Sequence, residues 1–227
     1  MIDKGILFVE GMVSAILNGN KTQTRRICNL KPIEGSFKNY SEDALDAAIR
    51  QGCEYKVGQE LYVRETWQYY DWTKQGLPFI RYKAHNFNQL IEDIPEGWQQ
   101  RVMKVWADLS DPDNYNIDCC ARDRRWRPSI HMPRWASRIR LKVEDIKLEK
   151  LNSISIDDAI AEGVTEIMSM KLSHGMESRR HAGWLNYKDK TMLRCPVQSF
   201  KTLWESIYGE GSFEKPWVFA ITFKEIK

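Results

Sequence analysis

The chain has 227 residues, 42% of them hydrophobic and nine of them tryptophan, and its formal net charge is only +3. This length and composition predict a globular protein that can bury a core, and the small net charge says little about partners. No run approaches the roughly 18 apolar residues of a membrane span, and no signal-peptide pattern opens the chain. We therefore expect a cytoplasmic protein without a membrane partner.

Five cysteines stand at positions 28, 53, 119, 120 and 195. They form no Cys-x-x-Cys pair, and no histidine lies beside them at the spacing of metal ligands. This pattern favours reduced thiols over a disulfide framework or a zinc site. We expect no metal and no cofactor.

The stretch 19–26 reads Gly-Asn-Lys-Thr-Gln-Thr-Arg-Arg and follows a helix predicted over 12–18. Gly19 stands where a left-handed helix C-cap is favourable. Lys21 and Thr24 are three residues apart, so a straight strand would send them to opposite faces, whereas a turn would bring them together. If they meet, a desolvated lysine can lose its charge and activate the threonine hydroxyl.

Alternating apolar and polar residues predict strands over 61–67, 139–144 and 217–224, and a weaker one over 81–84. Several dispersed strands with few helices favour a small mixed β-barrel over an α/β sheet. Glu65 falls on the apolar face of the first strand, where an unpaired charge is costly. We expect it to pair with Arg25, Arg26 or Arg64.

Three helices are predicted over 41–51, 155–162 and 200–208. Ser41 and Ser155 stand at N-cap positions, and Gly163 ends the second helix. The stretches of about 68–125 and 166–199 lack sustained periodicity, which predicts insertions that carry loops and short elements. With no internal repeat and no low-complexity linker, residues 1–227 are expected to form one domain.

Seven arginines and two aspartates lie between positions 118 and 140, with Trp126 and Trp135 among them. Guanidinium groups bind phosphates, and aromatic rings stack on bases, so this mixture suits single-stranded or looped nucleic acid. A solvated basic loop whose tryptophans lie in the core explains the same pattern. The residues alone leave both interpretations open.

The motif at 19–25 resembles the Gly-x-Lys-x-x-x-Arg signature of ASCH domains, which are PUA-like β-barrels associated with RNA. Residues 58–67, 126–138, 154–163 and 217–223 are similar to a long subset of this family found in bacteriophages and prophages. The resemblance implies an α+β fold, a PUA-like mixed β-barrel decorated by short helices. It also implies a bacterial host cytoplasm and RNA, single-stranded nucleic acid or a modified nucleoside as partner.

The resemblance implies chemistry as well. ASCH amidohydrolases that act on N4-acetylcytidine carry a base and a nucleophile at places that match Lys21 and Thr24, and a glutamate that aligns with Glu162. A metal-independent ribonuclease is another activity of the family. We favour binding, with hydrolysis as the alternative, and the oligomeric state stays open. The candidate nucleic-acid-binding residues are Arg25, Arg26, Arg64, Arg124, Arg125, Trp126, Arg127, Arg134, Trp135 and Arg138.

Overall fold

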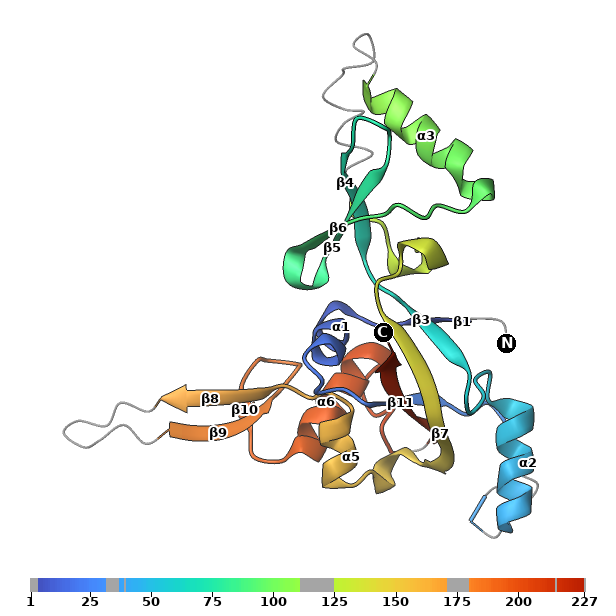
Figure 1. Cartoon of the computed structure of the whole chain (residues 1–227). Helices are drawn as coiled ribbons and strands as arrows, with labels where there is room; N and C mark the ends of the chain where they lie inside the picture. Colours follow the sequence, from blue (N-terminus) through green and yellow to red (C-terminus); the bar gives the residue numbers. More distant parts are fainter. Residues whose placement is uncertain are drawn as a thin grey trace, which may run out of the picture. The chain divides into compact units, whose positions relative to one another are not determined.

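The computed structural model describes residues 4–31, 37–38, 40–110, 125–170, 180–214 and 216–226 (Figure 1). The chain divides into two compact units. Unit 1 comprises residues 1–14, 60–141 and 226–227, and unit 2 comprises residues 15–59 and 142–225. None of the helices in the described ranges is long and apolar enough to cross a membrane.

Unit 1 contains an antiparallel sheet in the order β4-β5-β6, made of β4 (Trp67–Trp72), β5 (Pro78–Tyr82) and β6 (Phe87–Leu90). Strand β1 (Lys4–Leu7) pairs in parallel with β3 (Glu60–Arg64). Helix α3 (Glu96–Ser110) follows the three-stranded sheet along the chain. The short 3-10 helices Ala84–Asn86, Ser129–His131 and Arg134–Ala136 also belong to this unit.

Three aromatic residues contribute to the core of unit 1. Alternate residues of β4 and β5 lie on the same face of the sheet. These side chains pack against Met132 and Ala136. Burial of such rings supplies most of the apolar area that holds a small unit together. The buried members are Trp67, Tyr69, Ile80, Tyr82, Ile91, Met132 and Ala136.

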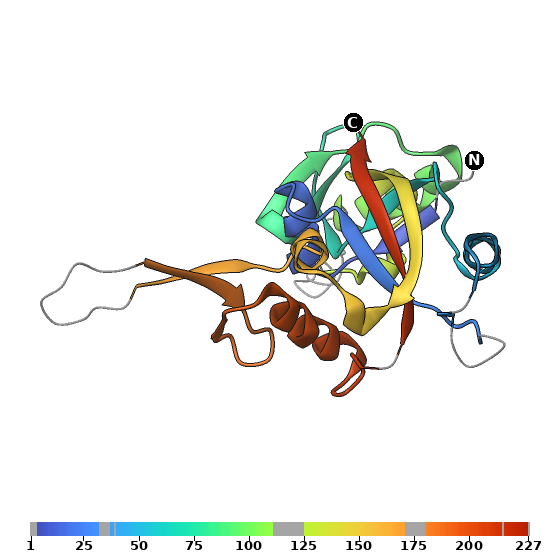
Figure 2. The same ribbon diagram turned by 90° about the horizontal axis from the view of Figure 1, so that it is seen from below.

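Unit 2 contains strands in the order β7-β11-β2, which Figure 2 shows side by side in yellow, red and blue. They are β2 (Gln23–Ile27), β7 (Arg140–Lys150) and β11 (Trp217–Ile226), and β2 pairs antiparallel with β11. Helix α1 (Glu10–Leu17), whose first residues belong to unit 1, precedes β2, and α2 (Glu42–Gly52) follows it. A 3-10 helix, Leu151–Ser153, leads from β7 to α5 (Ile156–Ala161).

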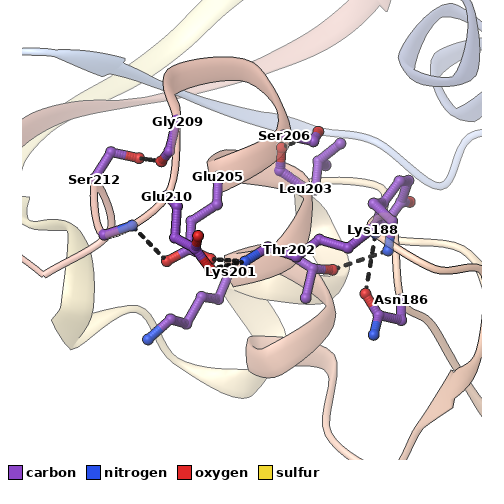
Figure 3. A network of polar contacts seen from close by, with 12 residues as sticks. Asn186, Lys188, Lys201, Thr202, Leu203, Glu205, Ser206, Gly209, Glu210 and Ser212 are labelled. Atoms are coloured by element: carbon purple, nitrogen blue, oxygen red, sulfur yellow. Dashed lines mark hydrogen bonds and ion pairs between the residues drawn. The ribbon is translucent and has the colours of Figure 1, made fainter.

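A second sheet in unit 2 has the order β10-β9-β8, from β8 (Glu166–Met170), β9 (Arg180–Leu185) and β10 (Met192–Leu193). Helix α6 (Pro196–Tyr208) is fastened to it, because Ser199 Oγ donates to the Leu185 carbonyl at 2.6 Å. Near the end of α6, Lys188 Nζ pairs with Glu205 at 2.9 Å and with Glu210 at 3.0 Å (Figure 3). These contacts fix the helix that carries Phe200.

The α+β class is observed. No sheet in the described ranges closes into a barrel, so the PUA-like barrel is not confirmed. Both predicted N-caps are confirmed: Ser41 Oγ accepts from Ala44 N at 3.3 Å, and Ser155 Oγ accepts from Asp158 N at 3.1 Å. The strand predicted over 61–67 is two strands, because β3 ends at Arg64 and β4 begins at Trp67.

The described parts of 68–125 and 166–199 contain regular elements that the sequence interpretation missed. The former holds β5, β6 and the 15-residue helix α3, and the latter holds the sheet β10-β9-β8. Helix α3 carries apolar residues at helical spacing along its length, Trp98, Val102, Val105 and Leu109, a pattern that the sequence interpretation overlooked. The single-domain prediction stays a prediction beside the two compact units.

Candidate functional site

The end of α1 fixes the backbone of Lys21. Gly19 has φ of 73°, the left-handed conformation predicted for it, and the amides of Asn20 and Lys21 both donate to the Ala15 carbonyl, at 2.8 and 3.1 Å. Lys21 then forms an antiparallel bridge with Glu162. The lysine is therefore held by a helix cap on one side and by the end of α5 on the other.

Lys21 and Glu162 form a buried ion pair. Nζ of Lys21 lies 2.8 Å from Glu162 Oε2 and also donates to the Glu162 carbonyl at 2.8 Å. Their side chains are only 2% and 4% exposed. Burial lowers the pKa of Lys21, the Glu162 carboxylate opposes this, and the charges of Arg26 and Arg25 lower the pKa further. The net direction brings this ammonium closer to deprotonation than a surface lysine.

Arg25 shares the same carboxylate. Its Nη1 lies 3.1 Å from Glu162 Oε1, and its Nη2 lies 2.7 Å from Glu149 Oε1 and 3.4 Å from Asp158 Oδ2. The guanidinium also lies 5.9 Å from the centroid of the Phe200 ring. Two cations thus face three carboxylates in a cluster formed by β2, β7, α5 and the residues that flank β2 and α5, with a ring of α6 beside Arg25.

Gly163 makes room for this cluster. It has φ of +80°, and a Cβ there would lie 2.8 Å from the Cβ atoms of both Lys21 and Ala15. Real Cβ atoms do not approach so closely, and L side chains rarely adopt this φ. Glycine at this position therefore lets the chain turn out of α5 directly against Lys21.

Thr24 is buried but is not joined to the ion pair. Arg25 follows it in β2, and consecutive strand residues point to opposite faces, so the Thr24 side chain faces away from the Arg25 cluster. Within the described ranges, no hydrogen bond links Thr24 to Lys21 or Glu162. The structure brings Lys21 and Glu162 together and leaves the Thr24 hydroxyl apart from them.

Arg26 shares the Thr24 side of β2, by the same alternation. Its positive charge acts on Tyr55, whose pKa burial raises and Arg26 partly lowers. Arg26 also adds to the positive potential at Lys21. Arg25 and Arg26 therefore act on the ion pair from different directions rather than forming one basic surface.

Glu65 pairs with Arg138 in unit 1, so the expectation of Arg25, Arg26 or Arg64 was wrong. Arg138 Nε lies 2.9 Å from Glu65 Oε1, and Nη2 lies 3.0 Å from Oε2 and 3.0 Å from the Ala84 carbonyl. Burial raises the pKa of Glu65, and the Arg138 hydrogen bonds and charge oppose that shift. Seventy-three positions separate the partners, and periodicity carries no signal over such a distance.

The arginine and tryptophan side chains of the arginine-rich segment differ in their exposure to solvent. Arg125, Trp126 and Arg134 are exposed, and Trp126 keeps 40% of its surface accessible. Arg124 lies outside the described residues, as do Cys119 and Cys120. Part of the segment is therefore exposed to solvent.

Arg64, Arg127, Trp135 and Arg138 are only partly exposed. The Arg127 guanidinium carbon lies 4.9 Å from the Tyr69 ring centroid, and Trp135 packs edge-on against Trp67 and Trp98. Arg64 Nε donates to the Ser129 carbonyl at 3.2 Å. For Trp135 the core interpretation of the sequence is the one observed.

A separate cavity of about 430 Å³ lies in unit 2 and is lined by residues of α2, the 55–57 segment and β7. Tyr55 and Ile146 are its buried members, and exposed charged side chains such as Asp46 and Arg50 also line it. Neither Lys21, Thr24 nor Glu162 borders this cavity.

Sequence reasoning missed Glu149, Gln23 and Gly163 as parts of the Lys21 cluster. Glu149 stands among alternating charges in β7, where nothing in the sequence marks it as the partner of Arg25. Gly163 was assigned only a helix-ending role. Among the described residues, no group of three or more histidine, cysteine, aspartate or glutamate side chains is arranged to hold a metal ion.

No protein-family model matches this chain, and no curated protein or solved structure is found to be similar to it.

Proposed function

We propose that this chain binds single-stranded nucleic acid, with RNA as the expected ligand, as an ASCH-type protein of the bacteriophage and prophage subset. The observation that supports this is the exposure of Arg125, Trp126 and Arg134 in one short segment of unit 1. Guanidinium groups contact phosphate oxygens, and an exposed indole offers a stacking surface that accepts any base. As part of the same proposal, the fold is of the PUA-like barrel type. A modified nucleoside is the alternative ligand.

The proposal depends on some candidate residues more than on others. Arg138 is half-buried and pairs with Glu65, and Arg127 is half-buried against Tyr69, whereas Arg125 and Arg134 are exposed to solvent. Arg25 is committed to three carboxylates inside unit 2. The expected contacts to nucleic acid are those of Arg125, Trp126 and Arg134.

The test measures binding of a labelled mixed-sequence single-stranded RNA by fluorescence anisotropy at several salt concentrations. The double variant Arg125→Gln/Arg134→Gln is expected to bind more weakly. Its salt slope is expected to fall by about 1.4, because each lost phosphate contact removes about 0.7 from the slope for single strands. A charge-matched control is Lys147→Gln/Lys224→Gln, which alters exposed lysines of unit 2. Equal affinity and slope for wild type and the Arg125/Arg134 variant would contradict the proposal.

A second candidate function is hydrolysis of an acylated cytidine, favoured by the buried Lys21–Glu162 pair. In this reaction Thr24 Oγ attacks the acetyl carbonyl while a neutral Lys21 accepts its proton. The carbon–nitrogen bond then breaks, the cytidine amine leaves with a proton, and water releases acetate from Thr24. Because the Thr24 side chain lies on the other face of β2 from Arg25 and its ion pairs, such a step requires a local rearrangement.

Mass spectrometry of N4-acetylcytidine incubated with the protein tests this candidate. Lys21→Arg keeps the charge but removes the base, so turnover is expected to disappear while RNA affinity persists. Equal turnover by both proteins excludes Lys21 as the base. If neither protein releases acetate, only the binding function is retained.

A further inference from the structure

An exposed aromatic ring opens strand β6 in unit 1. Phe87 keeps 49% of its surface accessible, although its strand belongs to the sheet β4-β5-β6. Its cross-strand partner is Tyr82, which is fully buried. The two ring centroids lie 6.4 Å apart with the ring planes inclined by only 22°. The aromatic surface of the core therefore continues through Tyr82 to a ring that reaches solvent.

Arg138 supports both rings. Its guanidinium carbon lies 4.4 Å from the Tyr82 centroid and 5.3 Å from the Phe87 centroid. The same guanidinium is held by both oxygens of Glu65 and by the Ala84 carbonyl. A planar group with its charge already paired therefore rests on these rings and limits their movement.

The turn before Phe87 determines the backbone position of this residue. His85 and Asn86 have φ of 65° and 48°, the left-handed region that residues other than glycine rarely occupy. Both side chains are exposed, as is that of Asn88 after the ring. Phe87 is thus a single exposed ring between polar neighbours along the chain.

This combination points to a particular kind of ligand. Protein docking patches expose contiguous apolar surface, whereas one flat ring beside hydrogen-bonding side chains suits an unstacked base. Gln89 lies two residues further along β6, on the same face as Phe87. Its Oε1 accepts from the Tyr82 hydroxyl at 3.5 Å, and its amide NH2 is of the type that donates to base edges.

We propose that Phe87 is a stacking platform for one unpaired base of a single-stranded nucleic acid, held in place by Tyr82 and the Glu65–Arg138 pair. The proposal rests on the proposed nucleic-acid function and names a contact that the arginine-rich segment does not supply. Stacking releases no counterions, so its loss is distinguishable from loss of a phosphate contact.

Substitution of Phe87 separates stacking from other contacts. Binding of the labelled RNA is expected to weaken about tenfold in Phe87→Ala with the salt slope unchanged, because base stacking on an aromatic side chain has this magnitude. Phe87→Leu is expected to weaken binding similarly, since it keeps apolar area but loses the flat ring. Phe87→Trp is expected to retain affinity. Met103→Ala, which trims another exposed apolar side chain of unit 1, is the matched control and is expected to bind like wild type.

Crosslinking of the unaltered protein gives a second measurement that does not depend on a variant folding. RNA containing 4-thiouridine is expected to crosslink within the tryptic peptide 84–101 on irradiation, with tandem mass spectrometry placing the adduct at Phe87.

The outcomes distinguish this proposal from the function on which it rests. Wild-type affinity in both Phe87→Ala and Phe87→Leu, or crosslinks confined to other peptides, overturns the platform even where the Arg125/Arg134 variant binds weakly. Wild-type affinity in Phe87→Leu alone points to a general apolar contact and overturns it as well. An absence of RNA binding by the wild type overturns both proposals.

Discussion

Units 1 and 2 each bury a glutamate against a cation, and the two pairs differ in what the cation can do. Glu162 divides its two oxygens between Lys21 and Arg25, whereas Glu65 uses both oxygens on Arg138. Lysine loses a proton when it is desolvated, but arginine stays charged at any accessible pH. The unit 2 pair therefore has a group that can transfer a proton, and the unit 1 pair holds its arginine as a fixed cation.

Desolvation acts on both pairs in the direction of the neutral form. It lowers the pKa of Lys21 and raises the pKa of Glu65, while the oppositely charged partner opposes the shift in each case. In unit 2 the neutral form is an amine, a base. In unit 1 the neutral form of Glu65 is a carboxylic acid. Its partner Arg138 stays charged, and this arginine contacts the rings of Tyr82 and Phe87 without transferring a proton.

The largest expected loss of stability comes from removing the charge of Glu162, which compensates Lys21 and Arg25. Glu162→Gln leaves Lys21 and Arg25 buried with one carboxylate fewer, and it is expected to destabilise the protein by about 3–5 kcal/mol. Glu65→Gln leaves Arg138 its Ala84 hydrogen bond and its ring contacts, so a smaller loss of about 1–3 kcal/mol is expected. Urea unfolding followed by circular dichroism measures both.

The surface pair Asp145–Lys147 provides the control for these two variants. Its lysine side chain is 72% exposed and lies 3.7 Å from the aspartate, so Asp145→Asn is expected to cost about 0.5 kcal/mol or less. A loss for Glu162→Gln no larger than that of Asp145→Asn would contradict the view that the unit 2 cluster is electrostatically interdependent. A larger loss for Glu65→Gln than for Glu162→Gln would reverse the comparison.

A smaller loss of stability is expected from substitution of Gly163 in unit 2. Gly163→Ala places a methyl group 2.8 Å from the Cβ of Lys21, whereas Gly58 has the same φ of +80° with nothing within 4 Å. Both substitutions strain the backbone by about 1 kcal/mol, but Gly163→Ala adds a clash of about 1–3 kcal/mol that displaces Lys21 or Ala15. Thermal unfolding of the two variants isolates the clash as their difference. Equal melting temperatures would show that the backbone at 163 relaxes freely.

Local features of this fold were predictable from the sequence. Ser41 and Ser155 cap their helices, Gly19 ends α1 in the left-handed conformation, and alternation located β7 and β11. Each of these rests on a few adjacent residues whose backbone preferences determine the outcome. Helix α3 was missed although Trp98, Val102, Val105 and Leu109 recur at helical spacing along it, because it lies within a stretch that was interpreted as an insertion.

The partners of buried charges were harder to predict. Glu65 was expected to be paired because a charge on an apolar strand face is costly, and it is paired, but with Arg138 rather than a nearby arginine. Glu149 reaches Arg25 across 124 positions, and nothing in the alternation of β7 distinguishes it from exposed glutamates. The sequence predicts that a buried charge has a partner, but the identity of that partner depends on the tertiary structure.

The smallest expected effect is a change in how stability depends on pH, and it separates the two buried pairs. Because the pKa of Lys21 in the folded state lies below its usual 10.5, the unfolded state binds more protons between the two values, and the free energy of unfolding rises with pH there. Because the pKa of Glu65 lies above its usual 4.5, the folded state binds more protons, and the free energy of unfolding falls as pH rises from 4.5 through the raised pKa. Subtracting the unfolding profiles of Lys21→Met and Glu65→Gln from that of the wild type isolates each contribution. The Lys21 difference is expected to rise on the alkaline side and the Glu65 difference to fall on the acid side. Flat difference profiles for both variants would show that each group titrates alike in the folded and unfolded states, and the contrast between the two units would then lie in geometry alone.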